Sequence, residues 1–340
     1  MESTSTIINY QHRQAGHCES GATSNLLKFW GQDVSEPMAF GIGNGLYFSY
    51  IPFLKIQFAP MISFRNLPNT VFRRSMAYLG IDATVIKKFK DPKEAMDALD
   101  RNLERGIPTG CQVGVFQLTF FPPEYRMHYN MHNLVVFGKE GDQYHVSDTV
   151  MEHVHLISYD DLLRVRYAKG AFAPQGKMYW INKIDKTLDL KPAVIMGIKK
   201  TVYEMIGIPF PLIGVKGLRW MARDLKKWPK KHGNDKASFY LGQILRMAED
   251  FGTGGAGFRY IFGAFLKEAG ELFNNHETLL EASDMMGKTA NKWREFTYIG
   301  ARNCKNRSKP EEDYGMLSAK LLEIADGEEK VYQKLKNIKF

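Results

Sequence analysis

Apolar and polar residues follow different patterns on the two sides of residue 188. In the first part, Asp91–Arg105 has apolar residues at helical spacing and ends at Gly106-Ile107-Pro108, which predicts a helix and its stop. Cys111–Phe121 is apolar and alternating, as is typical of a central strand, and Met178–Ile181 suits a last strand. The first part therefore mixes helices and strands.

Beyond residue 188 the long periodic segments are helical. These segments are Phe239–Phe251, Phe258–Phe273, Glu277–Ile299 and Gly315–Leu335. We therefore predict an α+β domain over residues 1–187, followed by an all-α domain over residues 188–340.

Residues 132–148 have the pattern of a β-hairpin. Two β-rich runs, His132–Gly138 and Gln143–Asp148, flank the short glycine-containing turn Lys139–Asp142. With this turn, the numbers of facing residues sum to about 281, which places His132 opposite Asp148 or its neighbour. Facing side chains lie roughly 5 Å apart, so Asp148 can accept a hydrogen bond from one ring nitrogen of His132. The alternative is a solvated histidine near an unrelated aspartate.

Cys18 stands where a helix is expected to begin. Gly16-His17-Cys18 marks a turn, small polar residues follow, and Leu26-Leu27 then opens an apolar stretch. A helix N-terminus offers free N–H groups and a positive dipole end, and both stabilise a thiolate, the nucleophilic form of cysteine. A small cysteine buried in the core is the alternative. With His132 as base and Asp148 as the orienting carboxylate, Cys18 completes a candidate triad.

The order Cys18, His132, Asp148 resembles that of papain-like cysteine enzymes, and most closely the peptidase-like domain of bacteriocin-exporting transporters. A finer resemblance is to the butirosin-biosynthesis protein H (BtrH) family. The segments that carry it are Gln11–Ser20, Glu36–Phe48, His132–Gly138 and Val146–Asp148, while Gly255–Arg259 and Phe265–Ala269 resemble the accompanying helical domain.

This resemblance implies a papain-like domain with Cys18 on its N-terminal helix and His132 and Asp148 on an antiparallel sheet. It also implies an acyltransferase that moves an acyl group from an acyl carrier protein thioester to an amine and forms an amide, in secondary-metabolite or lipid biosynthesis. The expected partners are the carrier protein and a small-molecule amine. No bound cofactor and no metal are expected, because the donor arrives as a phosphopantetheine thioester on the carrier.

The oxyanion hole departs from the family pattern. In the transporter peptidase domains, a glutamine about six residues before the cysteine supplies one donor. This chain has His12 there, with Gln14 nearby. The backbone N–H of Cys18 is one expected donor, and His12 and Gln14 are candidates for the other.

A glycine-rich segment, Phe40–Tyr50, follows the predicted Cys18 helix. Glycines at alternate positions let a backbone or a ligand approach closely. Gly43, Asn44 and Gly45 are therefore candidates for lining a substrate channel, and a tight chain crossing is the alternative.

The net charge of +9 is concentrated in one segment. Residues 191–232 hold ten lysines and arginines and only two acidic residues. Such a patch attracts acidic surfaces, and we interpret it as the docking site for an acidic carrier protein. The docking candidates are Lys216, Arg219, Arg223, Lys226, Lys227, Lys230 and Lys231. Two alternatives are a plain solvated face and peripheral contact with an anionic membrane, because the apolar segment Ile206–Ile213 is adjacent; nucleic acid is not expected.

Cysteine use and the N-terminal sequence indicate a cytoplasmic enzyme. The three cysteines, Cys18, Cys111 and Cys304, lie far apart and suggest neither a disulfide framework nor a zinc site. The first residues lack the features of a secretory signal, and no run of about 18 apolar residues predicts a membrane-spanning helix. Two other functions stay open: a peptidase or amidase that uses the same triad with water as acceptor, and a non-catalytic binding module.

Overall fold

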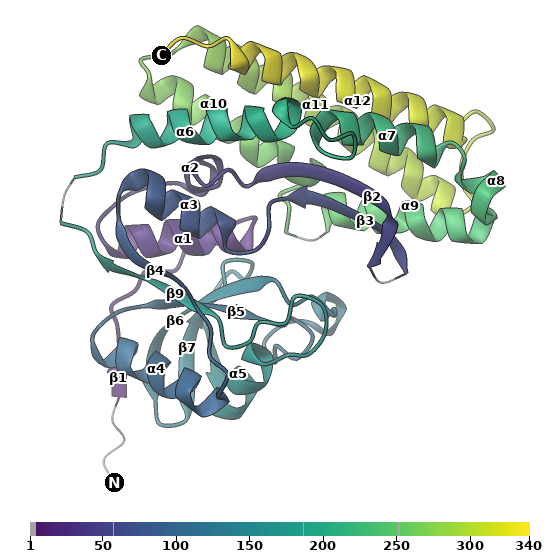
Figure 1. Cartoon of the computed structure of the whole chain (residues 1–340). Coiled ribbons are helices and arrows are strands. Elements are labelled where there is room, and N and C mark those ends of the chain that lie inside the picture. The colour runs from purple at the N-terminus through teal and green to yellow at the C-terminus, as the bar shows by residue number, and fades with distance from the viewer. Residues whose placement is uncertain (1–4, 57, 186, 251) are drawn as a thin grey trace. The chain divides into compact units, whose positions relative to one another are not determined.

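A computed structural model describes residues 5–56, 58–185, 187–250 and 252–340, and it divides into two compact units (Figure 1). Unit 1 comprises residues 1–39 and 68–189, and unit 2 comprises residues 40–67 and 190–340. The later boundary falls close to the expected one at 187. Residues 40–67 depart from the expected contiguous first domain, because they form a hairpin whose aromatic side chains pack with unit 2.

Unit 1 is built on an antiparallel sheet. Its strands run in the order β4-β9-β5-β6-β7-β8, and β1 pairs with β6. The strands are β1 (Ser5–Ile7), β4 (Asp82–Lys87), β5 (Thr109–Val113), β6 (His132–Glu140), β7 (Gln143–Ser147), β8 (His155–Ser158) and β9 (Met178–Lys183). The helices are α1 (Cys18–Phe29), α2 (Glu36–Ile42, which continues into unit 2), α3 (Thr70–Leu79), α4 (Pro92–Glu104), a 3-10 turn (Pro123–Tyr125) and α5 (Tyr159–Arg166).

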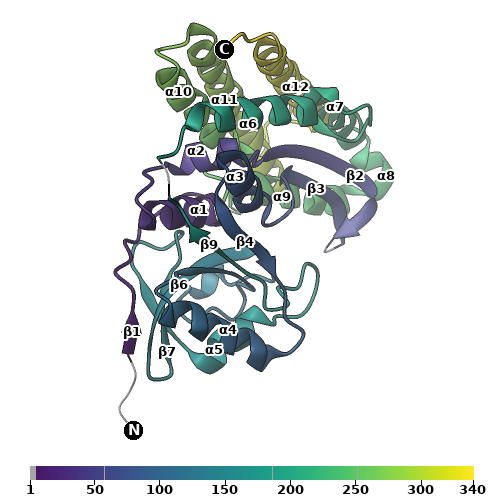
Figure 2. The same ribbon diagram turned by 60° about the vertical axis from the view of Figure 1, so that its left-hand side comes forward.

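Helices α1 and α4 cover opposite faces of this sheet (Figures 1 and 2). The apolar stripe of α4, which includes Met96, Leu99 and Leu103, is buried against Leu134 and Val136 of β6. Alternate residues of a strand point to opposite faces, so Asn133 and Val135 face the α1 side. The sheet thereby holds the start of β6 beside the start of α1.

The predicted strand Cys111–Phe121 is shorter than expected. Strand β5 ends at Val113, and the chain then turns through hydrogen bonds from Leu118 N–H to Val115 O and from Phe121 N–H to Leu118 O. Val115, Leu118 and Phe121 are all buried in the core, so the apolar residues recur every three positions rather than every two. Cys111 lies in this core, as predicted.

The hairpin of β6 and β7 forms, but its turn is tighter than predicted. Only Gly141 and Asp142 separate the strands, and Gly141 has a φ of 60° that suits glycine. Val136 faces Val146 and Glu140 faces Gln143, so facing numbers sum to 282 or 283 rather than 281. The register is therefore shifted by one or two residues.

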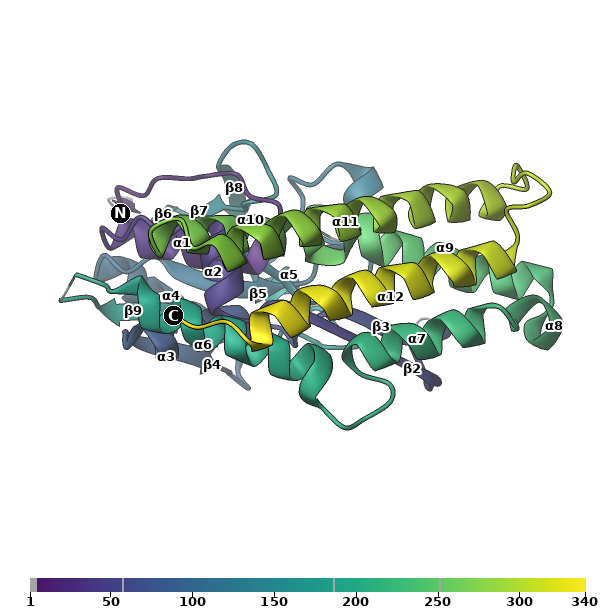
Figure 3. The same cartoon turned by 90° about the horizontal axis from the view of Figure 1, so that it is seen from above.

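Unit 2 consists of helices and one two-stranded hairpin (Figure 3). The hairpin strands are β2 (Leu46–Ile56) and β3 (Ala59–Arg65). The helices are α6 (Leu190–Val202), a π-helical turn (Tyr203–Gly207), α7 (Gly214–Leu225), α8 (Trp228–His232), α9 (Asn234–Glu249), a 3-10 turn (Ala256–Phe258), α10 (Arg259–Leu272), α11 (Glu277–Cys304) and α12 (Tyr314–Lys336). The four predicted helices correspond to α9 through α12, although residue 251, at the predicted end of the first, lies outside the described residues.

Aromatic rings and one buried ion pair connect the hairpin to the helices of unit 2. Phe48 packs edge-on against Phe64, and Phe64 against Trp293 of α11. The guanidinium of Arg259 lies over both Phe64 and Trp293 and donates to the carboxylate of Glu328 on α12. Hairpin and helices therefore share one core. Among the described residues, no helix is long and apolar enough to span a bilayer.

Candidate active site

Helix α1 begins at Cys18, as predicted. His17 is the N-cap: its backbone is extended, and its Nδ1 accepts a hydrogen bond from the Ser20 N–H at 3.4 Å. The Glu36 carboxylate accepts from the N–H groups of Gly16 at 3.0 Å and His17 at 2.7 Å. Hydrogen bonds to the Glu36 carboxylate and to the His17 cap therefore fix the turn before the cysteine. Cys18 occupies the first helical position, where backbone N–H groups lack partners within the helix.

The residue after the cysteine anchors α1 to α3. Glu19 is fully buried, and its carboxylate accepts from the N–H groups of Val71 at 2.8 Å and Phe72 at 3.3 Å, in the first turn of α3. An anion is stabilised at that position by the helix dipole. This contact fixes the start of α1 within unit 1.

His132 lies at the start of β6 and hydrogen-bonds to Asp148, just after β7. Its Nε2 is 2.6 Å from Asp148 Oδ2, and both side chains are buried. The other carboxylate oxygen of Asp148 accepts from the Val150 N–H at 3.1 Å. The ring of Phe121 lies edge-on to the imidazole. Asp148 is therefore fixed on one side by backbone and faces the imidazole on the other.

The imidazole also hydrogen-bonds to Cys18. Because Nε2 faces Asp148, Nδ1 is the nitrogen left for the thiol. Burial acts to lower the pKa of His132, but the charges and hydrogen bonds of Asp148 and Cys18 raise it to about 10. The structure thus brings the three predicted residues together, with a histidine that favours its cationic form at neutral pH.

Sequence reasoning missed one neighbour of the cysteine. Asn133 directs its side-chain nitrogen toward Cys18 Sγ at 3.8 Å, and its side-chain oxygen accepts from the Tyr179 hydroxyl at 3.1 Å. All three side chains are buried. The sequence signal that could have identified Asn133 is a polar amide directly before the apolar run Leu134–Phe137, because a buried amide needs hydrogen-bond partners.

The two oxyanion candidates contact other groups. His12 Nδ1 lies 2.8 Å from Ser147 Oγ, and its Nε2 lies 3.1 Å from Met151 O. The amide nitrogen of Gln14 donates to Val150 O at 3.3 Å, and this side chain is exposed. Together these two residues therefore contact the chain on either side of Asp148. Asn133 is the side-chain amide that faces the sulfur.

Gly43, Asn44 and Gly45 lie in unit 2. The buried Asn44 side chain donates to Thr201 Oγ1 at 2.8 Å, and a Cβ on Gly45 would stand 2.3 Å from the ring of Phe40. These contacts match the tight chain crossing that was the alternative to a substrate channel. The channel assignment stays a prediction.

The docking candidates lie on α7, on α8 and between these two helices, and their charges differ in how far they are paired. Arg219 donates to Asp326 and Glu329 of α12, so its charge is neutralised within the chain. Lys231 lies 3.8 Å from Asp224. Lys216, Arg223, Lys226, Lys227 and Lys230 have exposed side chains.

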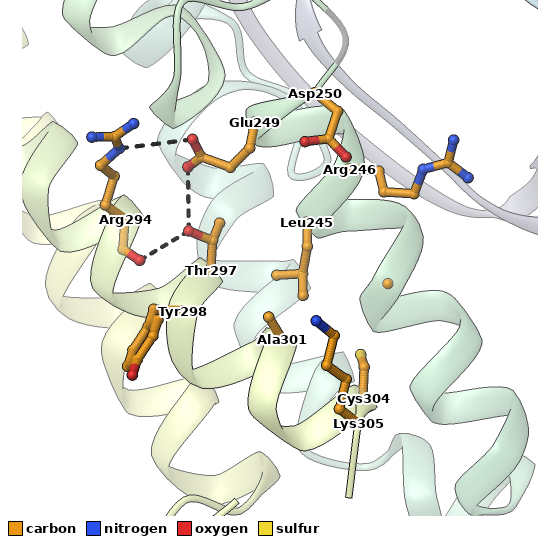
Figure 4. Close-up of a pocket in the computed structure, with 11 residues that line it drawn as sticks. Leu245, Arg246, Glu249, Asp250, Arg294, Thr297, Tyr298, Ala301, Cys304 and Lys305 are labelled. Carbon is orange, nitrogen blue, oxygen red and sulfur yellow. Dashed lines mark hydrogen bonds and ion pairs between the residues drawn. The ribbon is translucent and has the colours of Figure 1, made fainter. Parts of the chain in front are cut away.

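A cavity of about 680 Å³ lies in unit 2 between α9 and α11 (Figure 4). Leu245, Ala301 and Cys304 form apolar parts of its lining. Glu249 lies between Arg294 and Thr297 and hydrogen-bonds to the hydroxyl of the latter at 3.2 Å. None of the three candidate catalytic residues lines it.

A cysteine at a helix start, with a histidine on an antiparallel sheet and an aspartate just after the next strand, is the arrangement of papain-like cysteine enzymes. Comparison with protein families gives two matches. Residues 17–149 match "Butirosin biosynthesis protein H, N-terminal". Residues 160–335, just over half of the chain, match a domain of unknown function, DUF4872, so the chain belongs to that family; its N-terminal part is similar to the BtrH N-terminal domain.

Among solved structures, a C39-like peptidase from Bacillus anthracis aligns at 13% identity with a TM-score of 0.38. The alignment covers 53% of this chain and 98% of that one. No curated protein matches the chain.

Proposed function

We propose that this protein is an acyltransferase that transfers an acyl group from a carrier-protein thioester to an amine through an acyl-Cys18 intermediate. The observation that carries the proposal is the position of His132, hydrogen-bonded to Cys18 on one side and to Asp148 at 2.6 Å on the other. A cationic imidazole beside the sulfur stabilises the thiolate. This arrangement supports nucleophilic catalysis.

In the first half-reaction, the Cys18 thiolate attacks the thioester carbonyl and forms a tetrahedral oxyanion. The Cys18 backbone N–H and the Asn133 side-chain amide are the proposed donors to this oxyanion. The C–S bond to the carrier then breaks, and the leaving thiolate takes the proton of His132. Acyl-Cys18 and a neutral His132 remain.

In the second half-reaction, an amine attacks acyl-Cys18 and gives a proton to His132. The new C–N bond completes the amide, and the Cys18 thiolate leaves beside the imidazolium. Asp148 keeps the ring oriented in both halves. With water in place of the amine, the same residues would hydrolyse the intermediate, so the acceptor decides between transferase and hydrolase.

Two features favour a carrier-bound donor. The N-terminal family is named for a biosynthetic protein, and exposed Arg223, Lys226 and Lys227 on and just after α7 present positive charge that suits an acidic carrier. We also propose a cytoplasmic location, since Cys18, Cys111 and Cys304 form no disulfide with one another and oxidising compartments favour disulfides.

The test is intact mass spectrometry after incubation with acyl carrier protein thioesters. Wild type and Cys304→Ala should gain the mass of the acyl group, and Cys18→Ala should not. Adding amines should discharge the adduct as amide. Discharge only as free acid would favour the hydrolase, while absence of an adduct with undiminished turnover in Cys18→Ala would exclude covalent catalysis.

Carrier docking is tested by charge reversal. Lys226→Glu with Lys227→Glu should raise the KM for a carrier-linked donor and leave the KM for a free pantetheine thioester unchanged. Lys267→Glu with Lys288→Glu, at exposed positions on α10 and α11, is the matched control. Equal KM values in all three proteins would contradict docking at this surface.

A further inference from the structure

The tip of the β2–β3 hairpin presents large apolar side chains to solvent. Phe53 is 77% exposed, Leu54 is 47% exposed and Phe58 is 87% exposed. Scattered single apolar residues on a surface are ordinary, but three at one hairpin end are a concentrated apolar feature. Such a feature needs an explanation outside the packing of unit 2.

The backbone of the hairpin places these side chains outside the ladder. Ile51 pairs with Met61 and Lys55 with Pro60, so Pro52, Phe53 and Leu54 have no opposite residues and bulge outward. Phe58, in the turn, has a φ of 67°, a left-handed conformation that is unfavourable for a bulky residue. Both irregularities lead to solvent-exposed aromatic rings.

Cations from three elements gather beside this tip. Lys55 of the hairpin and Lys236 of α9 both lie over the ring of Tyr240, at 4.9 and 5.9 Å from its centroid. Burial, Lys231, Lys236 and Lys55 together lower the pKa of His232 at the end of α8, against a weaker opposing effect of Asp224. The lysines are therefore close enough to one another to act on one imidazole.

We propose that this end of unit 2, the hairpin tip together with Lys55, Lys231 and Lys236, binds the surface of an anionic phospholipid bilayer. Protruding phenylalanines enter the boundary between headgroups and acyl chains, and lysines beside them meet the lipid phosphates. Figures 1 and 2 show the hairpin tip and α8 at the same end of unit 2. Phe239 of α9, whose ring contacts that of Tyr240, is 42% exposed.

The charge and the shape of the surface select this occupant. Asp224, the acidic side chain that acts on His232, is only 16% exposed, whereas Lys231, 3.8 Å from it, is 58% exposed. The surface therefore offers cations around a convex apolar tip. A bilayer admits a protruding tip, whereas a folded protein partner would need a matching pocket.

The proposal is tested by co-sedimentation of the full chain with vesicles of phosphatidylglycerol and phosphatidylcholine, compared with phosphatidylcholine alone. Binding should require the anionic lipid and weaken with salt. Phe53→Ser with Phe58→Ser should reduce the partition coefficient by at least about tenfold. Lys55→Ala with Lys236→Ala should reduce it by about fivefold per lysine on anionic vesicles.

Two matched controls separate this effect from general damage. Leu67→Ser removes an apolar side chain that is 66% exposed beyond the other end of the hairpin, and Lys267→Ala with Lys288→Ala removes charges from α10 and α11; both should bind vesicles like wild type. Circular dichroism and thermal unfolding check that each variant is folded.

Three results would overturn the proposal. The first is absence of binding to anionic vesicles. The second is equal binding by wild type and the double phenylalanine variant. The third is a protein that does not bind vesicles but forms concentration-dependent dimers in sedimentation analysis, with the double phenylalanine variant remaining monomeric. None of these readouts depends on catalytic activity, so they are independent of the proposed acyl transfer.

Discussion

The side-chain nitrogen of Asn133 faces Cys18 Sγ at 3.8 Å, and the Tyr179 hydroxyl fixes the amide by donating to its oxygen. Both residues lie at the start of β6. Asn133 directs its amide to Cys18, and His132, at the strand's first position, hydrogen-bonds to Cys18 and to Asp148. One dipeptide therefore holds both the predicted base and the amide that we propose as an oxyanion donor.

Replacing Asn133 by alanine should lower kcat for acyl transfer by about 10²-fold with little change in KM, because an oxyanion donor acts in the transition state. Tyr179→Phe should give a smaller loss, since it only loosens the amide. Steady-state kinetics with a thioester donor measure both. Wild-type kcat in Asn133→Ala, with the protein folded, would show that the amide has no such role.

Alkylation of Cys18 by iodoacetamide should report the ion pair. The pKa of His132 is raised to about 10, so the imidazole stays cationic through neutral pH and stabilises the thiolate. The rate of alkylation should therefore stay high below pH 8.5, the ordinary pKa of a free thiol, and fall only under more acidic conditions. His132→Ala should move the midpoint up to about 8.5.

The control for this measurement is Cys304→Ala, which keeps the triad. Mass spectrometry after digestion assigns each rate to its cysteine. A slow Cys18 with an unperturbed profile in wild type would identify a structural thiol and favour the non-catalytic binding module.

The buried pair of Arg259 and Glu328 should matter strongly for stability. Both side chains are fully buried, and Glu328 also accepts from Trp293 Nε1 at 3.0 Å. Glu328→Gln leaves the guanidinium charge uncompensated, so it should lower the free energy of unfolding by about 3–5 kcal/mol. Glu323→Gln, which breaks the exposed pair with Lys292, should cost less than about 1 kcal/mol. Urea denaturation compares the two.

Gly21 lets α1 pack closely against the segment after Asp148. A Cβ at this position would stand 2.6 Å from Ala15 Cβ and 2.7 Å from Thr149 Oγ1. Gly21→Ala should therefore lower the free energy of unfolding by about 1–3 kcal/mol and displace Thr149, the residue after Asp148. Gly287→Ala, inside α11 with open space around it, should be neutral or stabilising by up to about 1 kcal/mol. Similar Tm values for the two variants would contradict this account.

The sequence was sufficient to predict the elements with strong periodicity and the three residues of the candidate triad. Helix α4 and the helices α9 through α12 follow from apolar spacing, and Cys18 heads α1 as its flanking residues indicate. The hairpin register was predicted one or two residues wrong, because a two-residue and a four-residue turn both fit Lys139–Asp142. Asp148 nevertheless hydrogen-bonds to His132 despite this shift in register.

Other features depend on contacts that no local pattern contains. The amide of Asn133 acquires its position from Tyr179, which is 46 residues away in the chain. The charge of Arg219 is neutralised by Asp326 and Glu329, over 100 residues later. Val115, Leu118 and Phe121 belong to an apolar run that predicts a strand, yet they reach the core from successive turns of the chain.

The hairpin of residues 40–67 also bears on how this protein can be divided. It interrupts unit 1 in the sequence but shares its aromatic core with residues 190–340. A polypeptide cut after Asp189 would keep Phe48 and Phe64 while losing Trp293, and we expect it to aggregate. Exchange of the catalytic part between homologues would then require two junctions, near residues 39 and 68, in addition to the one at 189. Residues 17–149, which match the N-terminal family, therefore do not coincide with unit 1. A gene fusion with a single junction would not transfer the complete candidate site with its own folding unit.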